Sequence, residues 1–136
     1  MKYACPHSTV MTFLLLAVLT GMACTRQPAA DPRRASVSGI VMLGDTPLPG
    51  GSITFLSKQD ANYRMTGMIQ ADGSFSFDGA PVGTVEAAVE TDSLRYADPA
   101  HYVPIPPQYS NLATSGLTYD LHQGDNPGVR VELQKR

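Results

Sequence analysis

Histidine and carboxylate side chains offer the most direct chemistry in this chain, as metal ligands or acid–base catalysts. His101 and His122 stand 21 positions apart, and neither lies in a zinc-type spacing such as H-x-x-E or H-E-x-x-H. No D-x-D-x-D-G run is present to bring about six to eight oxygens to one calcium ion. Aspartates in turns bond their own backbone instead, which is the role we assign to Asp72, Asp78, Asp92, Asp98 and Asp125. We therefore expect no metal and no cofactor.

Serine nucleophiles lack their usual surroundings as well. The chain contains neither a G-x-S-x-G elbow nor an S-x-x-K pair. Ser115 precedes Gly116 and an expected strand, where a hydroxyl can bond the loop backbone. Because no nucleophile is placed beside a base, we expect a non-catalytic protein with no catalytic residue.

Tyrosines offer binding rather than catalysis. Tyr96, Tyr102 and Tyr109 share one irregular interval of about 25 residues, 91–115, which also holds Pro104-Ile105-Pro106-Pro107. Tyrosine and proline form a stiff amphipathic surface that loses little entropy on binding. The interval could hold a glycan, a peptide or an envelope protein. Alternatively, its tyrosines cover the open end of the fold and bond loop carbonyls.

The domain that positions these residues follows an export segment. Lys2 is followed by an uncharged, apolar run from Val10 to Met22 and then by the small residue Ala23. A basic start, an apolar run and a small-residue cleavage site are the layout of a secretory signal peptide. The run has about a dozen residues, whereas a membrane-spanning helix needs about 20. We therefore expect residues 1–23 to be removed on export.

The cleavage site resembles the lipobox of bacterial lipoproteins. It reads Thr20-Gly21-Met22-Ala23-Cys24, with Gly21 where the commonest lipobox has leucine. The resemblance implies a cut before Cys24, diacylglycerol on its sulfur and acylation of the new amino terminus. Two acyl chains suffice for stable anchoring, at about 0.8 kcal/mol per buried CH₂. In the alternative, an ordinary signal peptide is cut after Ala23 or a little later and Cys24 is incidental.

Cysteine usage and composition fit one anchored domain. Cys5 lies in the leader, so lipid on Cys24 would leave neither a free thiol nor a disulfide. The polar, proline-bearing residues 24–35 indicate a flexible tether, and residues 36–136 suffice for one domain. The formal net charge of −2, without a basic stripe, argues against a nucleic-acid partner.

Short segments in which every second residue is apolar predict strands that bury one face. Turn sequences separate them, among them Asp72-Gly73, which we expect to close a hairpin. No stretch shows a sustained helical period. Seven short strands predict an all-β sandwich, with strands at 37–43, 51–57, 63–70, 74–78, 84–90, 117–121 and 129–134.

Several of these turn and core positions resemble the carboxypeptidase regulatory-like domain. The matching residues are Val37-Ser38-Gly39-Ile40-Val41, Pro47-Leu48-Pro49-Gly50-Gly51-Ser52-Ile53-Thr54-Phe55, Asp72-Gly73-Ser74-Phe75 and Pro81-Val82-Gly83. The resemblance spans roughly residues 36–134 and implies a Greek-key sandwich of prealbumin-like (transthyretin-like) topology without peptidase activity. One departure is Thr84-Val85, where tyrosine commonly follows the last glycine. The motifs mark turns and core positions and do not identify a ligand.

These observations together predict an exported, non-catalytic lipoprotein of the cell envelope. It would be membrane-anchored through Cys24, in the periplasm or on the outer surface, and would serve as a structural or binding module for an envelope protein or glycan. The alternative is a carbohydrate-binding module that uses Tyr96, Tyr102 and Tyr109. The absence of tryptophan weakens that alternative, because a sugar-stacking platform commonly uses this side chain.

Overall fold

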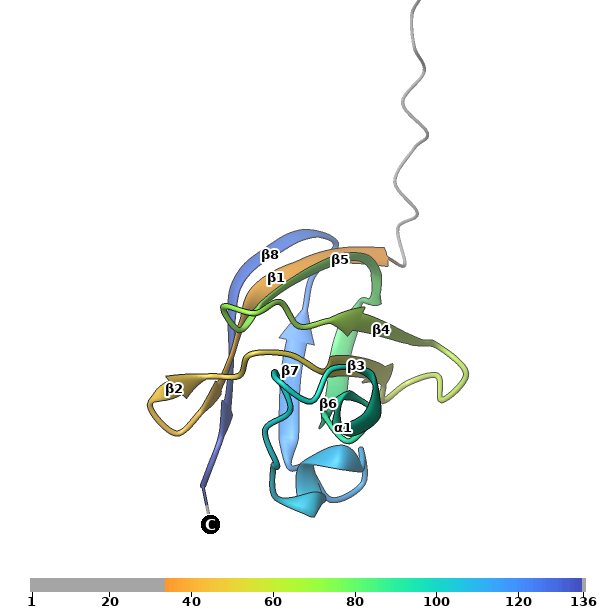
Figure 1. Ribbon diagram of the computed structural model, residues 1–136. Helices are drawn as coiled ribbons and strands as arrows, with labels where there is room; N and C mark the ends of the chain where they lie inside the picture. The colour runs from red at the N-terminus through yellow and green to blue at the C-terminus, as the bar shows by residue number, and fades with distance from the viewer. Residues whose placement is uncertain (1–33, 136) are drawn as a thin grey trace, which may run out of the picture.

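The computed structural model describes residues 34–135, in which 53% of residues lie in strands and 8% in helices. The leader (1–23), Cys24 and most of the tether lie outside these residues. Figure 1 shows two layers of strands with the helical segments at one end. The elements are β1 (Arg34–Leu43), β2 (Thr46–Pro47), β3 (Ser52–Ser57), β4 (Arg64–Met68), β5 (Ser74–Pro81), β6 (Gly83–Glu90), α1 (Leu94–Ala97), η1 (Pro107–Ser110), β7 (Leu117–Leu121) and β8 (Gly124–Leu133).

The strands form two sheets of four strands each. In the first sheet β1 is central: it pairs antiparallel with β5 and, near its end, with β2, and it pairs parallel with β8. The second sheet has the order β4-β3-β6-β7 and is antiparallel throughout. The all-β prediction with two sheets is thereby confirmed. Residues 34–135 contain one strand more than the seven expected, because the two-residue β2 pairs Met42 with Pro47 and Leu43 with Thr46.

Burial along the strands follows the alternation of the sequence. In β3, Ile53 and Phe55 are completely buried while their neighbours Ser52, Thr54 and Leu56 are partly exposed. The observed strands start and end within a few residues of the predicted limits. The largest difference is at β8, which begins at Gly124 rather than Val129, so the expected turn there is mostly strand; β1 begins at Arg34 rather than Val37. Ala35 is only 1% exposed, so the core already begins in the segment interpreted as tether.

An aromatic cluster joins the two sheets. Phe55 of β3 contacts Phe75 and Phe77 of β5, with ring centroids 6.2 and 5.8 Å apart. Tyr119 of β7 meets Phe55 edge-on, at 6.0 Å between centroids. Tilted and edge-to-face ring pairs contribute about 0.5–1.5 kcal/mol each beyond their burial. The cluster therefore holds the apolar faces of the two sheets together.

The turn at Asp72-Gly73 differs from the expected hairpin. It is tight, since the Gly73 N–H donates to the Gln70 carbonyl at 2.9 Å and Gly73 has a φ of 83°. Asp72 accepts bonds from the hydroxyl and the N–H of Ser74, which lower the pKa of its carboxyl. However, β4 pairs within the second sheet whereas β5 pairs with β1. The hairpin prediction is wrong, because a tight turn reverses the chain without selecting the strand it pairs with.

The irregular interval 91–115 folds over one end of the sandwich. It contains α1 and η1, and Figure 1 shows it at the lower end, whereas β1 begins at the upper end. Within residues 34–135, no helix has the length and apolar character needed to cross a membrane.

Replacing Phe75 with alanine is expected to lower the free energy of unfolding by about 3–5 kcal/mol. The ring is 2% exposed and lies between the sheets. Chemical denaturation of Phe75→Ala measures the loss. The exposed neighbour provides the control, since Ser76→Ala should stay within about 0.5 kcal/mol of the parent. A loss below about 1 kcal/mol for Phe75→Ala would show that this face of β5 is not core.

Candidate functional site

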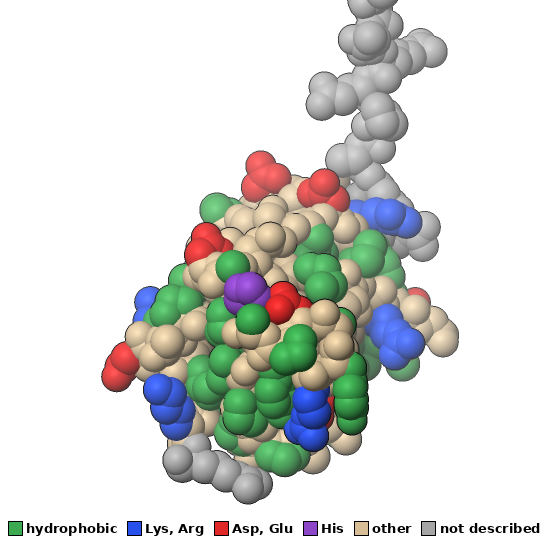
Figure 2. All heavy atoms as spheres, viewed as in Figure 1, with side chains coloured by type: hydrophobic (Ala, Val, Ile, Leu, Met, Phe, Trp, Pro, Cys, Tyr) green, Lys and Arg blue, Asp and Glu red, His purple; other side chains and the backbone are tan. Residues whose placement is uncertain are grey.

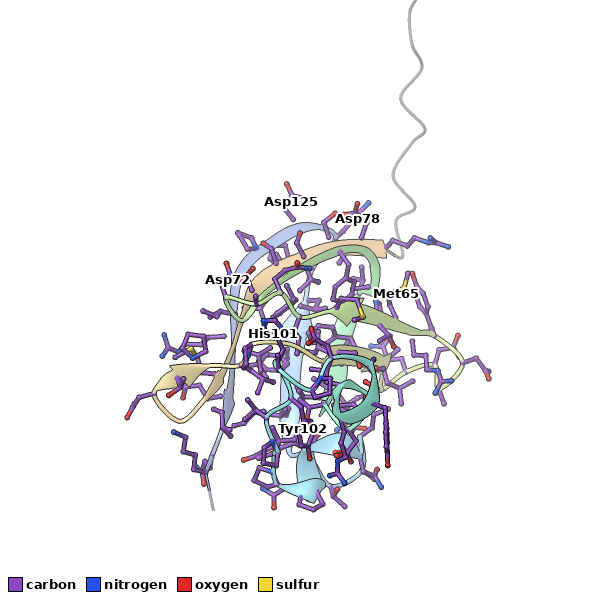
Figure 3. The ribbon with its side chains drawn as sticks, in the orientation of Figure 1. Met65, Asp72, Asp78, His101, Tyr102 and Asp125 are labelled. Atoms are coloured by element: carbon purple, nitrogen blue, oxygen red, sulfur yellow. The ribbon has the colours of Figure 1, made fainter. Side chains whose placement is uncertain are left out.

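The three tyrosines predicted to form a binding surface have different surroundings. Tyr96 projects from α1 and is 87% exposed. Tyr102 is half-buried, and Figure 3 shows it in the lower part of the molecule. Tyr109, in η1, is 5% exposed and belongs to the hydrophobic core. Tyr109 therefore fits the covering role that the sequence left open, and only Tyr96 and Tyr102 are available to a ligand.

Tyrosine hydroxyls bond the outer edge of β8. The Leu133 carbonyl accepts the Gly44 N–H, so the backbone of Leu133 faces β1. Because orientation alternates along a strand, the backbone groups of Arg130 and Gln134 face away from β1, along the open edge. The Tyr119 hydroxyl donates to the Arg130 carbonyl at 3.3 Å, and the Gln134 N–H donates to the Tyr109 hydroxyl at 3.1 Å.

A third tyrosine bonds the other edge strand of the first sheet. The Tyr63 hydroxyl donates to the Gly79 carbonyl in β5 at 3.4 Å. Unpaired strand edges are sites of unwanted pairing, so the contacts of Tyr119 and Tyr109 protect the edge at β8. The Tyr63 contact lies at the β5 bulge opposite Ala35 and Ser36. Sequence reasoning missed Tyr63 and Tyr119 as edge residues. Their only signal was an aromatic side chain that alternates with polar residues.

Charged residues next to α1 are bonded to one another at the surface. Arg95 donates to the Tyr102 hydroxyl at 2.6 Å and lies 3.3 Å from Asp92. The bond to Tyr102 raises the pKa of Arg95. His101 Nδ1 lies 2.7 Å from an Asp98 carboxylate oxygen. No other side chain among residues 34–135 bonds His101, and no cluster of His, Cys, Asp and Glu there could hold a metal ion.

The clearest concavity is an apolar groove at the end of the sandwich that bears the 91–115 interval. It consists of two adjoining cavities of about 460 and 260 Å³, which share Leu43 and Lys135 as lining residues. One wall is the connection between β1 and β3, at 46–49, and the other is the extended segment 103–107. Five of the lining residues are proline, so we call it the proline groove. Figure 2 shows apolar side chains gathered over this lower part of the molecule.

Of the residues that the structure describes, Lys135 is the one charged residue that lines the proline groove. Its methylenes pass over Gly44, where an added Cβ would lie 3.4 Å from the Lys135 Cδ. Among residues 34–135 its ammonium group has no ion-pair partner. Sequence reasoning noted the prolines of the 91–115 interval but did not predict the groove, because its walls come from three distant segments.

A second, polar cavity of about 400 Å³ lies near the start of β1. Figure 3 places two of its lining residues, Asp78 and Asp125, at the upper end of the molecule. Its buried polar residue, Asn126, donates to the carbonyls of Ser36, His122 and Gly124 and accepts the His122 N–H at 3.0 Å. These bonds are all internal, so Asn126 holds the turn between β7 and β8 rather than a ligand.

Comparison with known proteins identifies the fold but not a family. No protein-family model and no curated protein matches the sequence. The structure is similar to that of a DUF3823 family protein from Parabacteroides merdae, with a TM-score of 0.50 and 14% identity. The similarity covers 76% of this chain and 47% of that protein, so this chain spans less than half of its length. At this identity the similarity concerns the fold alone.

Tyr109→Phe is expected to cost about 0.5–1.5 kcal/mol in the free energy of unfolding, because the buried Tyr109 loses the hydroxyl that accepts the Gln134 N–H. Denaturation curves measure the effect. Tyr96→Phe is the matched control, because its hydroxyl is exposed, and it should shift stability by less than about 0.5 kcal/mol. Equal effects of the two substitutions would contradict the structural role of Tyr109.

Stability should decline at alkaline pH through Tyr119. Burial raises the pKa of Tyr119 to about 12, and the nearby Glu132 adds to the shift. The folded state therefore holds the phenol proton more tightly than the unfolded state, in which tyrosine titrates near about pH 10. The stabilisation of the folded state by this difference in pKa is complete below about pH 10. It is lost as the pH rises through about 12.

Because the ring is only partly buried, we expect this loss to be on the order of 1 kcal/mol. Denaturation curves of the parent and of Tyr119→Phe across this pH range measure the loss of stability that is due to Tyr119. The parent should lose stability more steeply than the variant. Parallel curves would show that Tyr119 titrates alike in both states.

Proposed function

We propose that this chain is a non-catalytic lipoprotein of the cell envelope, anchored through Cys24, whose β-sandwich presents a binding groove away from the membrane. The supporting observation is the course of β1. The strand starts at Arg34, in the last two residues of the predicted tether (24–35), and ends at Leu43 in the proline groove. Its 10 residues correspond to a length of roughly 33 Å. A tether at one end thus leaves the groove at the other, open to an envelope partner.

The proposed domain family is the carboxypeptidase regulatory-like one, with prealbumin-like Greek-key topology. Support comes from the roles of the motif residues. Leu48 and Phe55 are completely buried, and Phe75 nearly so. Gly51 and Gly73 both have positive φ, at 113° and 83°, as expected where a motif requires glycine in a turn. The motif positions are thus turns and core, which agrees with a family defined by its fold.

A non-catalytic role is supported by the arrangement of the charged groups. Ion pairs such as Lys58–Glu86 and Arg130–Glu132 join partly exposed side chains on the surface of strands. Catalytic sites usually gather groups with strongly shifted pKa values in a cleft. The large shift resolved within residues 34–135 belongs to Tyr119, which lines neither wall of the proline groove.

A carbohydrate-binding role would have to rest on Tyr96 and Tyr102 alone. Tyr109 is buried, and the Tyr102 hydroxyl already bonds Arg95. The proline groove, in contrast, offers a preformed apolar surface with an available charge. We therefore favour a protein partner over a glycan.

The anchor is tested with Cys24→Ser in the full exported chain. We expect the substitution to abolish incorporation of a labelled fatty acid and to remove the protein from the membrane fraction, because the acylated sulfur is lost. Cys5→Ser is the matched control, since this cysteine lies in the leader, and it should keep both properties. Continued membrane association of Cys24→Ser would contradict the lipid anchor.

A further inference from the structure

We infer that the proline groove binds an extended segment of a partner protein that carries two apolar side chains, two positions apart, beside a carboxylate. The inference rests on the binding role proposed above and specifies the partner's chemistry. It is derived from the shape, the wall composition and the charge of the groove.

The shape of the groove suits alternate side chains of an extended chain. Its two cavities adjoin and share Leu43 and Lys135. In an extended segment, side chains two positions apart point the same way and are separated by roughly 6.6 Å. Two such apolar side chains would enter the two cavities while the residue between them faces solvent.

The walls favour side-chain packing over pairing of strands. Proline has no N–H to donate to an added strand, and prolines stand on both sides of the groove. They also fix the backbone, so the groove loses little freedom when a ligand enters. The prolines concerned are Pro47, Pro49, Pro104, Pro106 and Pro107.

The charge of the groove selects an anionic group. Lys135 lines both cavities and has no ion-pair partner among residues 34–135, whereas Lys58 and Arg130 are each paired with a glutamate. A carboxylate next to the apolar side chains would supply this missing partner. An exposed pair of this kind adds modest affinity and mainly sets specificity.

The openness of the groove favours a protein segment over a small amphiphile. Small-molecule sites are clefts or cavities that bury about 70–90% of the ligand surface. Both cavities here are open to solvent along the surface between the two walls. A segment of a larger partner can be held by contacts on either side, so it does not need such enclosure.

The test is fluorescence anisotropy with the full exported chain, taken up in phosphatidylcholine nanodiscs if it is recovered in membranes. The probe is a labelled peptide Ser-Leu-Thr-Leu-Asp-Ser. Versions with lysine in place of aspartate, or with serine in place of both leucines, are compared with it. We expect the lysine peptide to bind about three- to fivefold more weakly and the serine peptide to lose at least about tenfold.

Variants of the chain assign this binding to the groove. Lys135→Glu should reverse the preference so that the lysine peptide binds better. Ile105→Asp should abolish binding of the acidic peptide, and Ile40→Asp is its matched control, because Ile40 is also half-buried but lies on β1 outside the groove. Circular dichroism confirms that each variant is folded.

Two results would overturn the inference. One is that no peptide binds, or that Lys135→Glu leaves the preference unchanged. The other is that dodecanoate binds in a Lys135-dependent manner while the peptides do not, which would make the groove a site for amphiphiles. Both results are independent of the Cys24→Ser experiment, so failure of the anchor and failure of this inference can be told apart.

Discussion

Phe55 packs against Phe75 and Phe77 across the space between the sheets, and this contact sets how the two layers face each other. A two-layer sandwich leaves open sides, where the backbone of each edge strand is unpaired. Tyr119 contributes both to the contact between the layers and to the protection of an edge. Its ring packs edge-on against Phe55, and its hydroxyl bonds the edge of β8. Burial of that ring raises the pKa of the phenol, so the core and the edge depend on one protonation state. Through Tyr119, the aromatic core between the sheets and the protected edge at β8 therefore depend on each other.

Strand positions could be predicted from the sequence because burial in a strand leaves a local, two-residue period. The pairing of the strands could not be predicted, because it depends on contacts between residues far apart in the chain. Asp72-Gly73 has the chemistry of a tight turn and forms one, yet the strands on either side of it enter different sheets. The parallel pairing of β1 with β8 joins Ala35 to Gly124 and has no local signature at all.

The candidate site was less predictable than the fold for the same reason. Tyr96, Tyr102 and Tyr109 look alike in the sequence, but only packing distinguishes an exposed ring on α1 from a core ring in η1. The proline groove needs Leu43, the 103–107 segment and Lys135 to meet at one end of the molecule. Each segment alone is an ordinary strand end, loop or terminus. Binding sites made from distant pieces in this way leave little trace in a single sequence.

The central position of β1 has a mechanical consequence. β1 is bonded to β5 on one side and to β8 on the other, and it begins within the last residues of the proposed tether. A pull applied at Arg34, against a partner held at the opposite end, runs along the strand axis. Such a load shears the hydrogen bonds of both neighbours together instead of opening them one after another. The pairing of β1 on both sides thus makes the sandwich resist unfolding under a pull along this strand.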